Sequence, residues 1–213
     1  MTRVAELRLA CSVEPWRRIG FEPVVEQSCA RIVVAGLTLR FAPSAESDAI
    51  GWVLTGEPLA EGDVDGIDTR WIDERQSGVE GATAVAAAVA VSAVDHIVIM
   101  TGDLERTSAA IERHLGLPNK RVRDAGGGVR QGFHRAGEII LEVVQRPDID
   151  PATKASLWGL VLVVDDLDST VAWLGPDAVG SVRDAVQPGR RIASIRREVG
   201  LGLPVALMTP HVR

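Results

Sequence analysis

Two side chains combine reactive chemistry with apolar surroundings: the imidazole of His96 and the carboxylate of Glu142. His96 directly precedes the apolar run Ile97–Thr101, and Glu142 lies inside the sequence IILEVV. In a site, an imidazole and a carboxylate can transfer protons or bind a divalent ion such as Fe, Mn, Zn or Ni. As structural residues, His96 would be a satisfied histidine at the rim of the core, and Glu142 would pair with Arg130 or Arg135. A third alternative is a buried hydrogen bond between His96 and Glu142 themselves.

Other routes to chemistry are poorly represented in the chain. It has no tyrosine, so no phenol can act as a catalytic acid. No serine lies in a nucleophile-elbow sequence, and no cysteine–histidine spacing fits a zinc site. The glycines Gly126–Gly128 lack the Lys-Ser/Thr of a phosphate loop and indicate a turn. The net charge of −6 gives the chain no global electrostatic reason to bind nucleic acid or an anionic membrane.

The compartment follows from the apolar segments and the cysteines. Residues 81–94 form an apolar run that is shorter than the about 20 residues that a membrane span needs. The sequence that ends at Cys11 is similar to a lipoprotein cleavage box, but Glu6 and Arg8 interrupt the hydrophobic region before it, so we expect no signal peptide there. Cys11 and Cys29 lie in separate apolar segments and are expected to be free, buried thiols. We therefore expect a cytoplasmic protein.

The most informative feature of the chain is an internal repeat. The sequence VDHIVIMTGDLERTSAAI starts at Val94, and LWGLVLVVDDLDSTVAWL starts at Leu157. Aligning Leu104 with Leu167 superposes the acidic residues on either side of each leucine. The ends of the two units, IILEVVQRP and PVALMTP, also correspond. One unit of about sixty residues therefore occurs twice.

Each unit has the order β-α-β-β-β. In the first unit, the β-branched run 97–101 predicts a strand, and Asp103 predicts the cap of a helix that continues to His114. Gly116 and Pro118 end that helix, and three short strands follow, the last over residues 138–145. The second unit repeats this pattern, with a strand over 160–164, a helix over 166–174 and strands that end at Met208.

The N-terminal part of the chain is harder to interpret. Residues 1–60 contain a strand-like start, a short helical stretch and strand-like runs at 23–27, 31–41 and 50–55. They are either a third, degenerate βαβββ unit or an unrelated β-rich extension. Residues 61–93 are predicted to be a linker, and the Ala/Val run at its end fits a strand or a helix equally well. The two clear units are 94–148 and 156–213, which together form one domain over 94–213.

Paired units that open with DHIVI, start their helices at a DLD-type sequence and close with ILEVV resemble the vicinal-oxygen-chelate superfamily. This is the fold of glyoxalases, bleomycin-resistance proteins and extradiol dioxygenases. The resemblance covers Val94 to Pro210. It implies an α+β fold in which two βαβββ modules form a curved, cup-shaped mixed sheet around a cavity, with residues 1–60 as a degenerate β-rich module.

The resemblance also implies where a metal ion would bind. In this superfamily the ligands come from the first and last strands of each unit, which places them at His96 and Glu142 in the first unit. The matching positions in the second unit are Gly159 and Ala206, and neither has a ligating side chain. Further ligands could come from His134, Glu138 or the N-terminal segment. The expectation is therefore one divalent ion (Fe, Mn, Zn or Ni), or none.

Strand alternation predicts the lining of the cup. If His96 and Glu142 face the cavity, alternation and the repeat place apolar residues beside them: Val98, Met100, Ile140, Val161, Val163 and Met208. The middle strands add residues that either turn inward as polar contacts or lie on the surface: Arg130, Gln131, Arg190 and Arg191. We predict a largely apolar cavity for a ligand with a hydrophobic body and one or two polar groups.

Two functions fit these expectations. The first is a glyoxalase-like enzyme (a lyase, isomerase or dioxygenase) that acts on a small, partly apolar molecule by proton abstraction or metal-assisted enolate chemistry. Glu142 would be its base or ligand, and His96 its ligand or polariser. The alternative is a non-catalytic binding or sequestration protein with a degenerate metal site. The partner is a small molecule, and neither nucleic acid nor a membrane. Because a cup needs two units and the N-terminal part looks like one, we also expect a homodimer.

Overall fold

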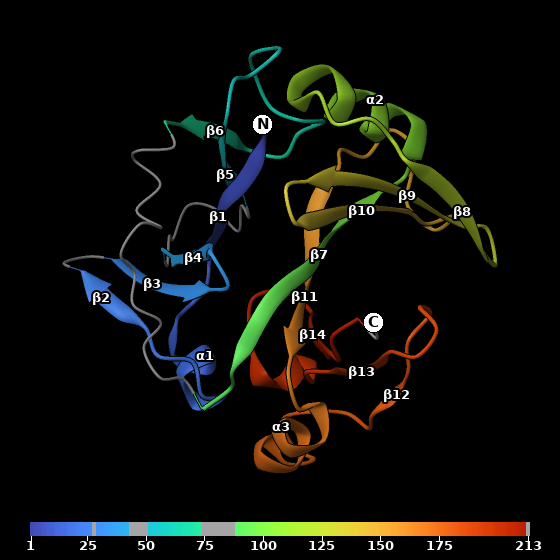
Figure 1. Ribbon diagram of the computed structural model, residues 1–213. Coiled ribbons are helices and arrows are strands. Elements are labelled where there is room, and N and C mark those ends of the chain that lie inside the picture. Colours follow the sequence, from blue (N-terminus) through green and yellow to red (C-terminus); the bar gives the residue numbers. More distant parts are fainter. Residues whose placement is uncertain (27–28, 43–50, 74–87, 212–213) are drawn as a thin grey trace.

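Strands dominate the computed structural model, which describes residues 1–26, 29–42, 51–73 and 88–211 (Figure 1). They form two sheets, a six-stranded one in the N-terminal half and an eight-stranded one in the C-terminal half. No helix among these residues is long and apolar enough to cross a membrane. The mixture of strands with a few helices confirms the predicted α+β class.

The first C-terminal module has the predicted βαβββ order. Its elements are β7 (Val91–Thr101), α2 (Leu104–Leu115), β8 (Arg121–Gly126), β9 (Val129–Ala136) and β10 (Ile139–Gln145). Strand β10 runs parallel to β7, and β9 and β8 follow as antiparallel neighbours toward the edge of the sheet. Buried Ile97 and Ile99 point to the core side of β7, so His96 and Val98 point to the other face.

The second module repeats this order. Its elements are β11 (Ser156–Val164), α3 (Leu167–Leu174), β12 (Arg183–Asp184), β13 (Arg191–Ser194) and β14 (Val205–Met208). Strand β14 runs parallel to β11, and β11 runs antiparallel to β7, which joins the two modules. Figure 1 shows the outer strands of both modules curling toward the same side. The predicted cup of two βαβββ modules is therefore confirmed.

The N-terminal half begins with the same arrangement. Its elements are β1 (Arg3–Leu9), α1 (Glu14–Arg18), β2 (Val24–Glu26), β3 (Cys29–Val34) and β4 (Leu37–Phe41). Strand β4 runs parallel to β1, as β10 does to β7. The run predicted as one strand over 31–41 is a hairpin, because Ala35 and Gly36 turn the chain with positive φ angles of 45° and 84°.

Two further strands complete the N-terminal sheet. Strand β5 (Gly51–Thr55) runs antiparallel to β1, and β6 (Thr69–Ile72) runs parallel to β5. They hold the places relative to β1 that β11 and β14 hold relative to β7. The single N-terminal unit thus finds its partner strands within the chain, which removes the reason for expecting a second copy. A homodimer stays a prediction, and sedimentation of the protein as a monomer would contradict it.

The segment 61–93 is more structured than the linker predicted there. It contains β6 and the first residues of β7, which starts at Val91. Its loop residue Asp65 is buried and accepts hydrogen bonds from Arg106 Nε (2.9 Å) and Thr107 Oγ1 (2.6 Å) of α2. This contact fixes the N-terminal half against the C-terminal module. Residues 74–87, which hold the first half of the Ala/Val run, lie outside the described part.

The start of α2 is fixed by the side chain of Asp103. Its Oδ1 accepts a hydrogen bond from the backbone N–H of Arg106 (3.0 Å), and the helix ends at Gly116, whose φ is 67°. We expect Asp103→Ala to lower the free energy of unfolding by about 1 kcal/mol, because one backbone donor loses its acceptor. Urea unfolding would measure this loss. Asp148→Ala is the control, since Asp148 pairs only with the exposed Arg146 and its loss should be within about 0.5 kcal/mol.

Candidate functional site

The hydrogen-bond register brings His96 and Glu142 together on one face of the C-terminal sheet. Strand β10 places Ile140 opposite His96 and Glu142 opposite Val98, so His96 and Glu142 are diagonal neighbours. His96 Nε2 lies 3.1 Å from Glu142 Oε2, and each side chain is 12% exposed. The other carboxylate oxygen, Oε1, accepts a 2.7 Å hydrogen bond from Gln131 Nε2. Both oxygens of Glu142 therefore have donors from the protein.

A third residue, Asp95, joins this pair because of a β-bulge. The pairing of β7 with β11 passes from His96 to Val94 and skips Asp95. Adjacent residues of a regular strand point to opposite faces, but a bulge redirects one of them. Asp95 Oδ2 consequently lies 2.7 Å from His96 Nδ1. No feature of the sequence indicates this contact.

Asp95 connects the pair to a buried guanidinium. Its Oδ1 accepts a 2.5 Å hydrogen bond from Arg190 Nη1, and the Arg190 side chain is 1% exposed. Arg190 Nε also donates to the carbonyl of Thr209 (2.8 Å). The result is a buried network of alternating charge, Arg190–Asp95–His96–Glu142.

The network determines the protonation state of His96. Burial by itself lowers the pKa of His96, but the hydrogen bonds and charges of Asp95 and Glu142 outweigh it and raise the pKa from 6.5 to about 9. Burial likewise favours protonated Asp95, but the hydrogen bonds from His96 and Arg190 prevail and lower the pKa of Asp95 to about 2. At neutral pH His96 is therefore an imidazolium whose two N–H groups donate to two carboxylates.

The residues present do not fit a divalent metal ion. The two further positions implied by the resemblance lie in the same cross-strand rows as the pair: Gly159 beside Val98, and Ala206 beside Val161. Neither has a donor atom. No group of three or more His, Cys, Asp or Glu side chains with metal-binding geometry occurs in the part of the chain that the structure describes. One imidazole and one carboxylate, already paired, are fewer ligands than such a site needs.

The additional ligands considered from the sequence lie elsewhere. His134 is on the opposite face of β9, where Nδ1 contacts the carbonyl of Leu117 (2.8 Å) and Nε2 contacts Ser108 Oγ (3.1 Å). Burial lowers the pKa of His134, so it is a neutral core residue. Glu138 is 98% exposed in the β9–β10 turn, near Arg135. Neither can complete a site at Glu142.

A cavity of about 190 Å³ adjoins the pair. Both modules contribute to its wall, including β8 and β12 from the two opposite ends of the sheet. It is lined by His96, Arg121, Arg123, Gln131, Phe133, Ile140, Glu142, Arg183, Asp184, Ala185, Val186, Gln187, Ile192 and Met208. The curled sheet thus encloses a small space whose wall carries the His96–Glu142 pair.

Three of the predicted contact residues line this cavity: Gln131, Ile140 and Met208. Four others share the face of His96 by register but are buried within the sheet and are not part of the lining: Val98, Met100, Val161 and Val163. The cavity therefore lies mainly over the strands that flank β7 and β11, and of that central pair only His96 of β7 belongs to its described lining.

The arginines at the cavity differ from those proposed from the sequence. Arg130 lies 2.6 Å from Glu105, Arg191 lies 2.6 Å from Asp168, and Arg190 is buried with Asp95. The lining instead includes Arg121, Arg123 and Arg183, so the cavity is more polar than predicted. Register explains the difference. Strand β8 places Arg121 opposite Phe133 and Arg123 opposite Gln131, on the cavity face, while Arg130 points the other way. Alternation within this hairpin is the signal that would have found them.

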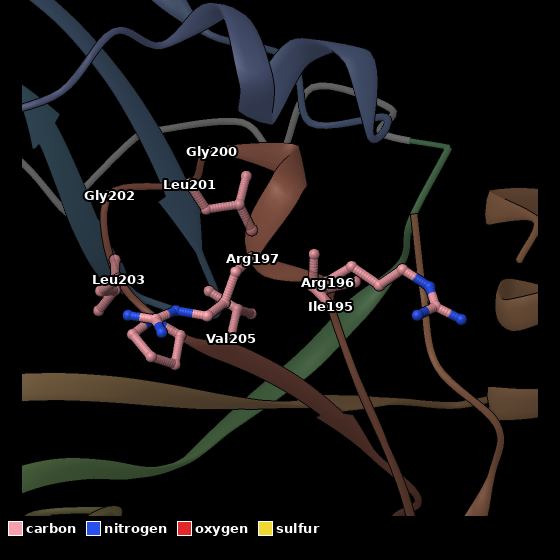
Figure 2. A pocket seen from close by; sticks show the side chains of 9 residues that line it. Ile195, Arg196, Arg197, Gly200, Leu201, Gly202, Leu203 and Val205 are labelled. Carbon is pink, nitrogen blue, oxygen red and sulfur yellow. The ribbon is translucent and has the colours of Figure 1, made fainter. Parts of the chain in front are cut away.

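A second hollow of about 220 Å³ lies along the segment Ile195–Val205 (Figure 2). Figure 2 shows Arg196 and Arg197 pointing to opposite sides of it. Arg196 Nε donates to the carbonyl of Pro176 (2.6 Å). One continuous segment forms its whole lining, and no acid–base pair faces it, so we take the cavity at His96 and Glu142 as the candidate site.

Comparison with known families and structures is consistent with this architecture. Residues 93–191 match the family described as Glyoxalase/Bleomycin resistance protein/Dioxygenase superfamily. A triple mutant of 4-hydroxymandelate synthase from Streptomyces coelicolor is 14% identical over 99% of this chain and 93% of that chain, with a TM-score of 0.67. Methylmalonyl-CoA epimerase from Mycobacterium tuberculosis is 19% identical over 60% of this chain and 94% of that chain, with a TM-score of 0.49. No curated protein sequence matches the chain. At 14% identity, the likeness to the synthase shows the fold alone.

Proposed function

We propose that this chain, whose residues 93–191 match the Glyoxalase/Bleomycin resistance protein/Dioxygenase superfamily, binds a small organic molecule in the cup of its C-terminal sheet without a resident metal ion. The observation that carries this proposal is the paired state of His96 and Glu142 in the wall of a cavity that both modules line. Of the four positions where the resemblance places metal ligands, His96 and Glu142 form an ion pair with each other. The other two, Gly159 and Ala206, have no donor atom. The fold thus keeps its pocket while the imidazole of His96 and the carboxylate of Glu142 satisfy each other.

The methionines offer a direct test of binding. The chain has three, of which Met208 lines the cavity, Met100 is buried in β7 and Met1 is 80% exposed. In protein labelled with ¹³C at the methionine methyl groups, Met208→Leu identifies the Met208 signal. We expect a small aromatic probe, phenylacetate or its neutral analogue phenylacetamide, to shift that signal in the presence of EDTA and to leave the Met1 signal in place. Failure of both probes to shift it would contradict the proposal.

Metal content provides an independent prediction. We expect protein purified without a metal-affinity tag to contain far less than one equivalent of Fe, Mn, Zn or Ni by mass spectrometry, because the two candidate ligands are paired with each other and His96 is protonated. The His96→Ala variant should have the same metal content as the unaltered protein. A stoichiometric ion that disappears in His96→Ala would show that the network opens to bind a metal.

A second candidate, proton-transfer catalysis, is favoured by the Asp95–His96–Glu142 chain that reaches the cavity. Such a relay can hold a proton at His96 Nε2 and pass it to Glu142. The test is exchange of the acidic C3 protons of a small keto acid, 2-oxobutyrate, in D₂O, followed by proton NMR. If the C3 proton signal disappears only when the protein is present, and persists with the Glu142→Gln variant, the result would favour an enzyme. Binding without exchange would favour the binding protein.

A further inference from the structure

Cations from both free edges of the C-terminal sheet meet at the cavity. Strand β8 is one edge of the eight-stranded sheet and contributes Arg121 and Arg123. Strand β12 is the opposite edge and contributes Arg183. The two edges are at opposite ends of the strand order, yet they line the same small space because the sheet is curled (Figure 1). The opening between the edges is therefore flanked by positive charge on both sides.

These arginines differ from their neighbours in their pairing. Arg130 and Arg191, on the adjoining strands, each have a carboxylate at 2.6 Å. Within the described residues, Arg121, Arg123 and Arg183 form no ion pair. The guanidinium of Arg121 lies over the ring of Phe133, 4.9 Å from its centre, a contact that holds it at the cavity without neutralising it.

The carboxylates of the lining do not balance this charge. Glu142 is already paired with His96, and Gln131 occupies its second oxygen. Asp184 is the other lining acid, and these two carboxylates are outnumbered by the three arginines and the protonated His96. Like charges that face one another across a gap raise the free energy of the empty cup, and an anion between them lowers it. The excess positive charge of the lining thus favours a negatively charged ligand.

The apolar part of the lining lies farther along the same cross-strand rows. Arg183, Ile192 and Met208 form one row over β12, β13 and β14. In the other module, Arg121 is followed by Phe133 and then by Glu142. Each row therefore starts with a cation at a sheet edge and continues inward with an apolar side chain. A ligand that matches both rows has its anionic group at the edges and an apolar body inside.

Building on the proposed function, we infer that the ligand is a small organic anion, such as a carboxylate with an aromatic or branched aliphatic body. The anionic group lies between Arg121 and Arg123 of one edge and Arg183 of the other. The body contacts Phe133, Ile192 and Met208. Arg123 and Arg183 are then the residues that determine specificity for charge.

The test compares phenylacetate with phenylacetamide, which have the same ring and differ in charge. Binding is followed by the Met208 methyl signal at low ionic strength, where exposed charges are least screened. We expect phenylacetate to bind at least about tenfold more tightly than phenylacetamide, and Arg123→Gln or Arg183→Gln to remove most of that difference. Arg130→Gln and Arg191→Gln are matched controls, because they remove the same charge from adjoining strands outside the cavity, and should leave both affinities unchanged.

Each outcome has a distinct meaning. If phenylacetamide binds as tightly as phenylacetate, the cup is a pocket as proposed but does not select anions, and the inference is wrong. The inference also fails if the control variants weaken phenylacetate as much as Arg123→Gln and Arg183→Gln do, since the effect would then be general electrostatics. If neither probe shifts the Met208 signal, the proposed function itself fails, and the inference with it. Thermal unfolding of each variant checks that the substituted arginines are not needed for folding.

Discussion

Arg190→Met is expected to lower the free energy of unfolding by about 3–5 kcal/mol, the largest single effect predicted for this chain. Arg190 is 1% exposed, and its guanidinium donates to Asp95 and to the carbonyl of Thr209. Methionine fills a similar volume but leaves Asp95, which is 4% exposed on its side chain, with one charged partner fewer. Removing one member of a buried ion network leaves an uncompensated charge, which is why the loss is large. Urea unfolding at pH 7 measures it.

The adjacent residue provides the control. Arg191 forms an exposed pair with Asp168, so Arg191→Met should cost less than about 1 kcal/mol. The double variant Arg190→Met with Asp95→Asn should lose less free energy of unfolding than the sum of the two single losses. The reason is that asparagine carries no charge that would be left buried without its partner. If Arg190→Met costs no more than Arg191→Met, Asp95 is reached by water and the network is not the buried unit described here.

The sequence predicted the fold well because its signals are local and repeated. Asp103 and Asp166 each cap a helix, and each accepts a backbone N–H three residues later. The apolar runs that follow one another along each unit become β7, β10, β11 and β14. The extent of β7 was underestimated, because its first residues pair with β11, and such long-range pairing has no signal in the segment itself. The same holds for β6, which exists because β5 lies beside it.

The candidate site was predicted only in part, for two physical reasons. The resemblance identified His96 and Glu142, and strand alternation placed Ile140 and Met208 beside them in the cavity wall. Alternation could not find Asp95, because adjacent residues share a face only where a bulge interrupts the strand. It also could not place Arg130 and Gln131 together, since neighbours in a regular strand point to opposite faces, and only Gln131 reaches the cavity. The edge arginines depend on how far the sheet curls, a property of the whole fold.

Raising the pH from 6.5 to about 9 is expected to remove about 3 kcal/mol of stability through His96 alone. The pKa of His96 is higher in the folded protein, about 9, than the 6.5 of the free side chain. Below pH 6.5 the imidazole is protonated in both states, so the stabilisation is fully present. Above pH 6.5 the unfolded chain loses the proton first, and stability falls until the folded state loses it as well, near pH 9. Urea unfolding at intervals between pH 6 and pH 9.5 would record this decline.

The composition of the chain makes this experiment unusually selective. There is no tyrosine, and Lys120 and Lys154 are the only lysines, so above about pH 7.5 few other side chains besides the cysteines titrate. A background in which Cys11 and Cys29 are replaced by alanine removes the thiols. In that background His96→Gln should have a nearly constant free energy of unfolding where the parent loses about 1.4 kcal/mol per pH unit. The comparison uses the slopes and not the absolute stabilities, so a general destabilisation by the substitution does not affect it. Equal slopes in the two proteins would mean that His96 is neutral in the folded state, and that the carboxylates beside it do not hold its proton.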